Sequence, residues 1–199
     1  MGFAEPVIGR AFARPVGSTH PTICDVSFPI MERFVTERLS AERLREEHLA
    51  GLVALHLDPD VSRYLGGVRS PEATAGYLAA SMAHWDQHGF GLWALRTRAG
   101  EFAGRAGIRH AVVAGAQELE IVYILKREFW GRGLASEIVA ALVRIAHPRL
   151  GLPSLVGLVV VGNGASCRVL EKSGFVRERT MLSPGEEVVI YRLAARRET

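Results

Sequence analysis

The sequence has little that would support a disulfide framework, a metal-binding module or a membrane span. Only two cysteines occur among 199 residues, Cys24 and Cys167, and neither has metal-ligand spacing. The longest apolar stretch, Leu155 to Val161, is far shorter than the roughly 20 residues that cross a bilayer. No basic segment followed by an apolar run marks a secretory signal. We therefore expect a cytoplasmic protein with no membrane partner.

Concentrated charge of one sign is also missing. Lys and Arg number 24 and Asp and Glu 21, which gives a net charge of +3 without a polycationic block. A nucleic-acid lattice usually requires a basic patch or stripe, so we expect a small anionic ligand and no nucleic acid. With 48% hydrophobic residues, the chain is long enough to bury one core.

The N-terminal region shows no regular period. It contains Pro6, Pro15, Pro21 and Pro29 with neither a helical nor an alternating pattern between them. We expect a flexible extension over residues 1–33 and a single domain over 34–199, as a monomer or homodimer.

Periodicity predicts an α/β (α+β) sandwich with a mixed sheet. Residues 35–43 fit strand or helix, and "DPDVSRYLGG" from Asp58 fits a loop and turn. Helices are predicted over 46–57, 71–88, 134–145 and 165–174, and strands over 90–95, 102–110, 118–125, 154–161, 175–181 and 187–193.

The segment "KREFWGRGLASE" follows the strand that ends at Leu125. Gly131 and Gly133 precede a helix, whose first N–H groups have no partner within the helix and attract anions. Lys126, Arg127 and Arg132 add positive charge. The glycines would let backbone approach phosphate oxygens, or they would only ease a chain reversal.

Two common phosphate motifs are excluded at this segment. The P-loop pattern G-x-x-x-x-G-K-[ST] is absent. A dinucleotide fold would need Gly or Ala at Ser136 and an acid near residue 161, and the sequence has neither. The remaining interpretation is a pyrophosphate held mostly by backbone.

The stretch "ELEIVYILKREFWGRGLASEIVAALV", followed by "GLVVVGNGASCRVLEKSGF", resembles the acetyl-coenzyme A core of the GNAT superfamily of N-acetyltransferases. With "FVTERL" and "GFGLWAL", the likeness covers about residues 34–193, and the pattern is similar to the subgroup of ribosomal-protein N-terminal alanine acetyltransferases. It implies a mostly antiparallel sheet flanked by helices with a splayed parallel strand pair. It also implies acetyl-CoA as cosubstrate and no metal.

The resemblance assigns coenzyme contacts residue by residue, although Trp130 departs from the usual Gln or Arg that opens the phosphate motif. Amides of about 131–136 would hold the pyrophosphate, and one strand edge would pair with the pantetheine arm. Asn163 is also a preferred helix N-cap, which needs no ligand. The implied coenzyme residues are Tyr123, Leu125, Arg127, Gly131, Arg132, Gly133, Leu134, Ala135, Ser136 and Asn163.

Two residues are the candidates for proton transfer. Leu170 occupies the place where many relatives have a tyrosine acid, so the resemblance favours Ser166 as the acid; the alternative is a capping or solvated hydroxyl. Glu120 is the carboxylate expected to relay a proton through water, although Val122 departs from the subgroup's glycine. The alternative for Glu120 is a solvent-facing strand residue.

The acceptor is a primary amine. An α-amine has a pKa of about 8 and needs less base help than a lysine near 10.4. We expect a protein N-terminal α-amine; the alternatives are an antibiotic or polyamine, or a non-catalytic acyl-CoA-binding module. Candidate residues for an acceptor groove, which fit a core equally well, are Arg63, Tyr64, Trp85, Phe90 and Trp93.

One pair of histidines has a spacing that could bind a metal ion. His84 and His88 are four residues apart, which places them on one helix face. The sequence shows no third ligand and no H-E-x-x-H motif, so no metal is expected.

Overall fold

An eight-stranded sheet forms the centre of the protein, in the order β1-β2-β3-β4-β5-β6-β8-β7. The computed structural model describes residues 31–147, 149–183 and 185–194, so most of the predicted extension 1–33 lies outside it. Neighbouring strands are antiparallel except β5 and β6, as predicted. The strands are β1 (Arg33–Val35), β2 (Leu39–Arg43), β3 (Leu92–Thr97), β4 (Phe102–Val113), β5 (Ala116–Leu125), β6 (Ser154–Val160), β7 (Val176–Ser183) and β8 (Glu186–Ala194).

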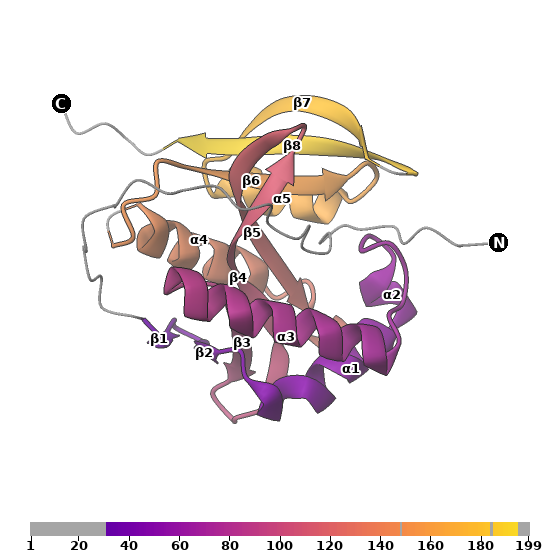
Figure 1. Ribbon diagram of the computed structural model, residues 1–199, viewed down its shortest axis with the longest axis vertical. Coiled ribbons are helices and arrows are strands. Elements are labelled where there is room, and N and C mark those ends of the chain that lie inside the picture. The colour runs from indigo at the N-terminus through magenta and orange to yellow at the C-terminus, as the bar shows by residue number, and fades with distance from the viewer. Residues whose placement is uncertain (1–30, 148, 184, 195–199) are drawn as a thin grey trace.

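Helices cover both faces of this sheet. In Figure 1, α1 to α3 lie together in the lower half of the view, and α5 lies beside β6 to β8. The helices are α1 (Leu49–Leu57), α2 (Pro59–Ser62), α3 (Pro71–His88), α4 (Leu134–Ala146) and α5 (Gly164–Lys172), with short 3₁₀ turns η1 (Glu46–His48) and η2 (Arg127–Phe129). No helix among the described residues is long and apolar enough to span a bilayer.

Local signals account for α3 at both ends. Ser70 Oγ accepts a hydrogen bond from the Ala73 amide at 3.2 Å, and Pro71 occupies the first turn. Gly89 ends the helix with a φ of 71°, a left-handed conformation that glycine adopts without strain. The helix predicted over 71–88 is confirmed.

The structure decides the secondary structure of one ambiguous region and corrects the prediction for another. Residues 35–43, which fitted strand or helix, contribute to β1 and β2. The loop and turn predicted from Asp58 contains the single-turn helix α2. Asp58 caps α2 by accepting from the amides of Asp60 and Val61, and Pro59 presets the first helical φ.

Strand β5 has one closed edge and one open edge. It pairs with β4 over the length from Gly104 to Val113. On its other edge, the register with β6 consists of Glu120 opposite Val156. The two parallel strands therefore diverge towards Leu125, as predicted, and leave backbone groups of β5 unpaired beside a gap.

The two faces of the sheet contact different helices. Ile121 and Leu125 of β5 belong to the core that includes Ile138 and Leu142 of α4. Ile124 belongs to a second core with residues of α1 and α3. Because side chains alternate along a strand, Glu120 lies on the same face as Ile124, opposite α4.

Candidate active site

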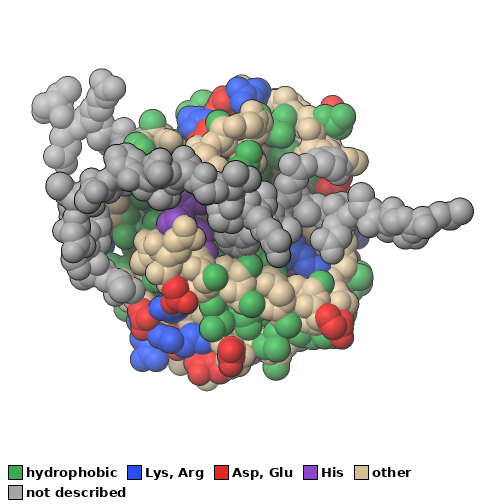
Figure 2. All heavy atoms as spheres, viewed as in Figure 1, with side chains coloured by type: hydrophobic (Ala, Val, Ile, Leu, Met, Phe, Trp, Pro, Cys, Tyr) green, Lys and Arg blue, Asp and Glu red, His purple; other side chains and the backbone are tan. Residues whose placement is uncertain are grey.

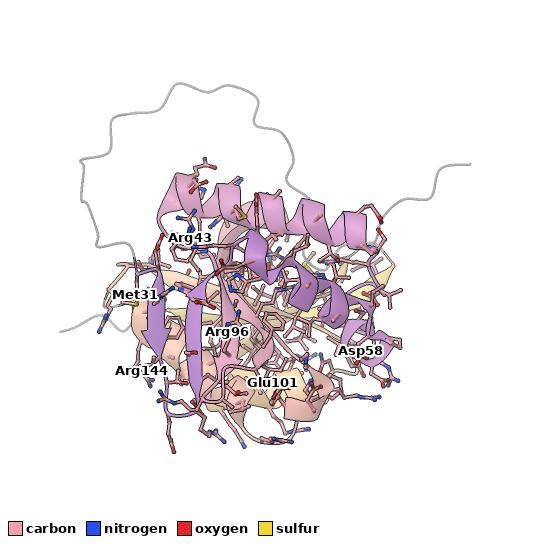
Figure 3. The ribbon with its side chains drawn as sticks, turned by 90° about the horizontal axis from the view of Figure 1, so that it is seen from below. Met31, Arg43, Asp58, Arg96, Glu101 and Arg144 are labelled. Carbon is pink, nitrogen blue, oxygen red and sulfur yellow. The ribbon has the colours of Figure 1, made fainter. Side chains whose placement is uncertain are left out.

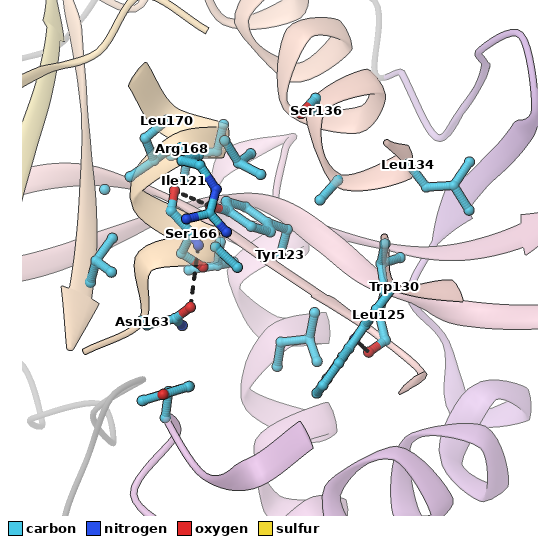
Figure 4. A pocket seen from close by; sticks show the side chains of 18 of the residues that line it. Ile121, Tyr123, Leu125, Trp130, Leu134, Ser136, Asn163, Ser166, Arg168 and Leu170 are labelled. Carbon is cyan, nitrogen blue, oxygen red and sulfur yellow. Dashed lines mark hydrogen bonds between the residues drawn. The ribbon is translucent and has the colours of Figure 1, made fainter. Parts of the chain in front are cut away.

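The gap between β5 and β6 opens into a cavity of about 540 Å³. Its walls come from β4, β5, β6, α2, the glycine loop, the first turn of α4 and the length of α5 (Figure 4). Arg127 and Arg132 are not among its lining residues. The other predicted site residues all line it: Glu120, Tyr123, Leu125, Gly131, Gly133, Leu134, Ala135, Ser136, Asn163 and Ser166.

The glycine loop presents backbone at the start of α4. Gly131 and Gly133 have φ values of 72° and 77°, in the left-handed region that favours glycine. Gly133 is the N-cap of α4, and no side chain of the described residues caps this helix. The first N–H groups of α4 thus remain available to an anion, and a helix N-terminus is where an anion is stabilised.

A distant arginine holds this loop in place. Arg38, between β1 and β2, donates from Nη1 to the Arg132 carbonyl at 2.7 Å. Its Nε lies 2.6 Å from Glu137 Oε2, in the first turn of α4. The clamp joins segments almost a hundred residues apart, and no sequence motif indicated it.

The two loop arginines contact other side chains and do not themselves line the cavity. Arg127 forms an ion pair with Asp60 of α2, and the guanidinium of Arg132 lies 5.7 Å from the Phe129 ring centre. Both side chains are exposed. An anion in the cavity would therefore meet loop amides before it met these two charges.

Two groups along β5 are already hydrogen-bonded. Trp130, which is 47% exposed, donates from Nε1 to the Leu125 carbonyl at 2.8 Å. The Tyr123 hydroxyl donates to the Ser166 carbonyl at 3.3 Å (Figure 4). Burial raises the pKa of Tyr123 to about 12, so its phenol keeps its proton at neutral pH.

The start of α5 brings Asn163 and Ser166 together. Asn163 Oδ1 accepts from the Ser166 amide at 3.2 Å, so its capping role is confirmed. Within the described parts of the chain, Ser166 Oγ has no hydrogen-bond partner, and the residue lines the cavity. The hydroxyl is therefore available to a ligand there.

Glu120 is buried, with 2% of its surface exposed, so the solvent-facing alternative is wrong. Arg109 donates to its Oε2 from Nε at 2.9 Å and from Nη2 at 2.7 Å. Glu120 Oε1 has no hydrogen bond to any described residue. One carboxylate oxygen is therefore held and the other remains accessible.

The arginines of β4 were not among the site residues predicted from the sequence. Arg105 and Arg109 both line the cavity. They are four residues apart on one strand, so their side chains lie on the same face of the sheet. Glu120, which stands opposite Arg109 on the neighbouring strand, lies on that face too. Two arginines in the otherwise apolar "FAGRAGIRH" were the signal that could have identified them.

The structure adds a third imidazole to His84 and His88. His110 of β4 lies beside them, with ring centres 4.2 to 5.3 Å apart, and histidines reach the surface in Figure 2. However, His84 Nδ1 lies 2.9 Å from the Phe90 carbonyl, and Nε2 accepts from the His110 amide at 3.1 Å. Both nitrogens of His84 thus bond protein groups.

Because of these histidines, we expect the free energy of unfolding to fall in mild acid. Burial lowers the pKa of His84 to about 4 from 6.5, so the neutral ring stabilises the fold fully above pH 6.5. That contribution is lost as the pH falls from 6.5 towards 4, by at most about 1.4 kcal/mol per pH unit. Urea unfolding at pH 7.5, 6 and 5 measures it. His84→Gln should show a shallower loss, and equal slopes would contradict the prediction.

Comparison with known proteins places the chain in a family. Residues 38–176 match the Acetyltransferase (GNAT) domain. The chain is 29% identical to an uncharacterised Bacillus subtilis protein, YkkB, over 80% of this chain and 94% of that protein.

Solved structures share the fold. An Agrobacterium tumefaciens acetyltransferase is 25% identical, with a TM-score of 0.72 over 92% of this chain and 99% of that chain. RimL, a ribosomal L7/L12 α-N-protein acetyltransferase solved with coenzyme A, is 23% identical, with a TM-score of 0.68 over 81% and 96% of the two chains. The family match covers most of the described residues, including the glycine loop and the starts of α4 and α5. The chain therefore belongs to the GNAT acetyltransferase family.

Proposed function

We propose that this protein transfers acetyl from acetyl-CoA directly to a primary amine, the α-amine of a protein N-terminus. The observation that carries the proposal is the open edge of β5 beside the uncapped N-terminus of α4, within one cavity. The coenzyme A bound to RimL supports the choice of donor.

The cavity offers a place for each part of the coenzyme. Amides of about 131–136 would bind the pyrophosphate, because the helix N-terminus and the positive φ of Gly133 expose them. The pantetheine arm would lie along the edge of β5 at Tyr123 and Leu125. The Leu125 carbonyl already accepts from Trp130, so the arm depends more on the remaining backbone groups of this edge.

The transfer forms a C–N bond and breaks the thioester C–S bond. The neutral amine attacks the carbonyl carbon, and Glu120 takes the amine proton through a water molecule at its accessible oxygen. Ser166 Oγ gives a proton to the departing sulfur, and proton exchange through water from Glu120 back to Ser166 restores both groups. An α-amine with a pKa of about 8 is about one-tenth neutral at pH 7, so modest base help suffices.

The fold itself does not select the acceptor, because a Vibrio cholerae spermidine N-acetyltransferase shares it at 16% identity and a TM-score of 0.65. The charge of the cavity favours an α-amine over a polyamine or aminoglycoside. Four basic residues and two acidic ones line it, so it would repel a polycation; they are Arg105, Arg109, Arg168 and Lys172, with Asp60 and Glu120. RimL is described as an α-N-protein acetyltransferase of a ribosomal protein, which supports a protein N-terminus as the acceptor.

A panel assay tests this proposal. Acetyl-CoA is incubated with N-terminal peptides, polyamines and aminoglycosides, and the release of free thiol is measured. We expect release with peptides that carry a free α-amine and none with N-blocked copies. If the protein binds acetyl-CoA but no amine releases thiol above background, it is a binding module instead.

Ser166→Ala is expected to lower kcat about tenfold with an unchanged Kd for acetyl-CoA. The effect lies below the usual range for general acids because a thiol with a pKa of about 8.5 is a good leaving group. Ser173→Ala is the matched control, since Ser173 Oγ bonds the Val169 carbonyl at the far end of α5. Wild-type turnover in Ser166→Ala would exclude this hydroxyl as the acid.

A further inference from the structure

A buried arginine in the cavity wall forms no ion pair with any described residue. Arg105 is 3% exposed, and its Nε and Nη1 are buried without a hydrogen-bond partner. No carboxylate of the described residues pairs with it. Because an unpaired buried charge is costly, a side chain of this kind is normally matched by an anion.

The groups around Arg105 do not neutralise it. Its guanidinium lies over the Tyr77 ring, 4.6 Å from the centre, and a ring face carries no net charge. Glu120 attracts Arg105 from a distance but forms no ion pair with it, because Glu120 Oε2 accepts from Nε and Nη2 of Arg109. His56, whose pKa burial lowers to about 3, is uncharged at neutral pH.

The charge on Arg105 persists under physiological conditions. Burial lowers the pKa of its guanidinium to about 10; the nearby charges of Arg69 and Arg109 act in the same direction, and Tyr77 and Glu120 act against it. A group with this pKa is still protonated at pH 7. The cavity wall therefore carries a permanent positive charge.

The position of Arg105 separates it from the predicted pyrophosphate site. Arg105 stands beside Ile124 in the β4–β5 register and contacts Tyr77 of α3. Its face of the sheet is the one covered by α1 and α3. The glycine loop leads into α4, which covers the opposite face.

We propose that Arg105 binds a carboxylate of the acetyl acceptor, so that the substrates are amines with an acidic group close to the amine. This inference rests on the proposed function. Such a carboxylate would come from an acidic side chain near a peptide N-terminus or from the α-carboxylate of a free amino acid. Either carboxylate can accept a charge-assisted hydrogen bond from a guanidinium.

Matched acceptors test the proposal without any variant. Peptides with Glu, Gln or Lys at the second position, and free glutamate and glutamine, are compared by thiol release. With wild-type protein we expect KM to be about tenfold lower for the Glu peptide than for the Gln peptide. If the free amino acids are acetylated and the peptides are not, the α-carboxylate is the group bound.

Arg105→Met should abolish the preference for acid while leaving the Kd for acetyl-CoA unchanged. Its melting temperature should stay the same or rise, because an uncompensated charge is removed. Arg144→Met is the matched control, since Arg144 is exposed on α4 at the rim of the molecule in Figure 3. This control should retain the preference.

The remaining outcomes separate the failure of this inference from the failure of the proposed function. Equal KM values for acidic and neutral acceptors in wild type would overturn the inference but leave the proposed function intact. A weaker Kd for acetyl-CoA in Arg105→Met, with the acid preference retained, would assign Arg105 to the coenzyme phosphates. If no acceptor is acetylated, the proposed function fails, and the melting temperature of the protein with the Glu peptide then tests the carboxylate site. A stabilisation by the peptide that is lost in Arg105→Met supports the site. No stabilisation by the peptide rejects it.

Discussion

Replacing Arg109 by methionine is expected to lower the free energy of unfolding by about 3 to 5 kcal/mol. Glu120 is 2% exposed, and both of its hydrogen bonds come from Arg109. Methionine has a similar length and no charge, so the variant leaves a buried carboxylate without its partner. Urea unfolding at pH 7.5, with the slope m compared between variants, measures the loss.

The neighbouring arginine provides a sharp control. Arg105→Met removes a charge that no described acidic residue pairs with, so it should cost little stability or even increase it. The double variant Arg109→Met/Glu120→Leu should regain much of the stability lost in Arg109→Met, because no unpaired charge remains at that pair. A loss below about 1 kcal/mol in Arg109→Met would mean that water reaches the carboxylate and replaces the arginine.

Gly133→Val is expected to weaken acetyl-CoA binding about a hundredfold. A φ of 77° is strained for any residue with a Cβ and most of all for a β-branched one, so the first turn of α4 would have to reorganise. An added Cβ would lie 3.5 Å from Arg38 Nη2, an ordinary contact. The effect therefore arises from the backbone, whose amides would no longer converge on the pyrophosphate.

Calorimetry with acetyl-CoA measures this effect, and Gly115→Val is the matched control. Gly115 has a φ of 85° in the turn between β4 and β5, with nothing within 4 Å of an added Cβ. It does not line the cavity. The control should lose stability and keep its affinity for acetyl-CoA. An unchanged Kd in Gly133→Val would remove the phosphate-loop proposal.

The local features of this site could be predicted from the sequence. The strand ending at Leu125, the glycine loop and the helix from Leu134 follow from periodicity and from backbone needs that extend over a few residues. Asn163 as a cap is equally local, since its side chain bonds an amide three positions later. Such signals are legible because the interacting groups are close in the chain.

The charges of the site could not be predicted in the same way. The sequence placed Arg127 and Arg132 near a phosphate, but the fold brings α2 to Arg127 and turns Arg132 towards Phe129. Arg105 and Arg109 look alike in the sequence. The register of β4 against β5 sets Arg109 opposite Glu120 and leaves Arg105 opposite Ile124.

The sequence by itself thus determined the order of elements, the glycine loop and the family resemblance, because these depend on neighbours along the chain. Only the tertiary structure decided that β6 meets β5 at Glu120, that Arg38 clamps the loop, and that one of two arginines is left without an acid among the described residues. Those features depend on strand register and on which helix covers which face. Both are set by packing between distant segments, which no local pattern encodes.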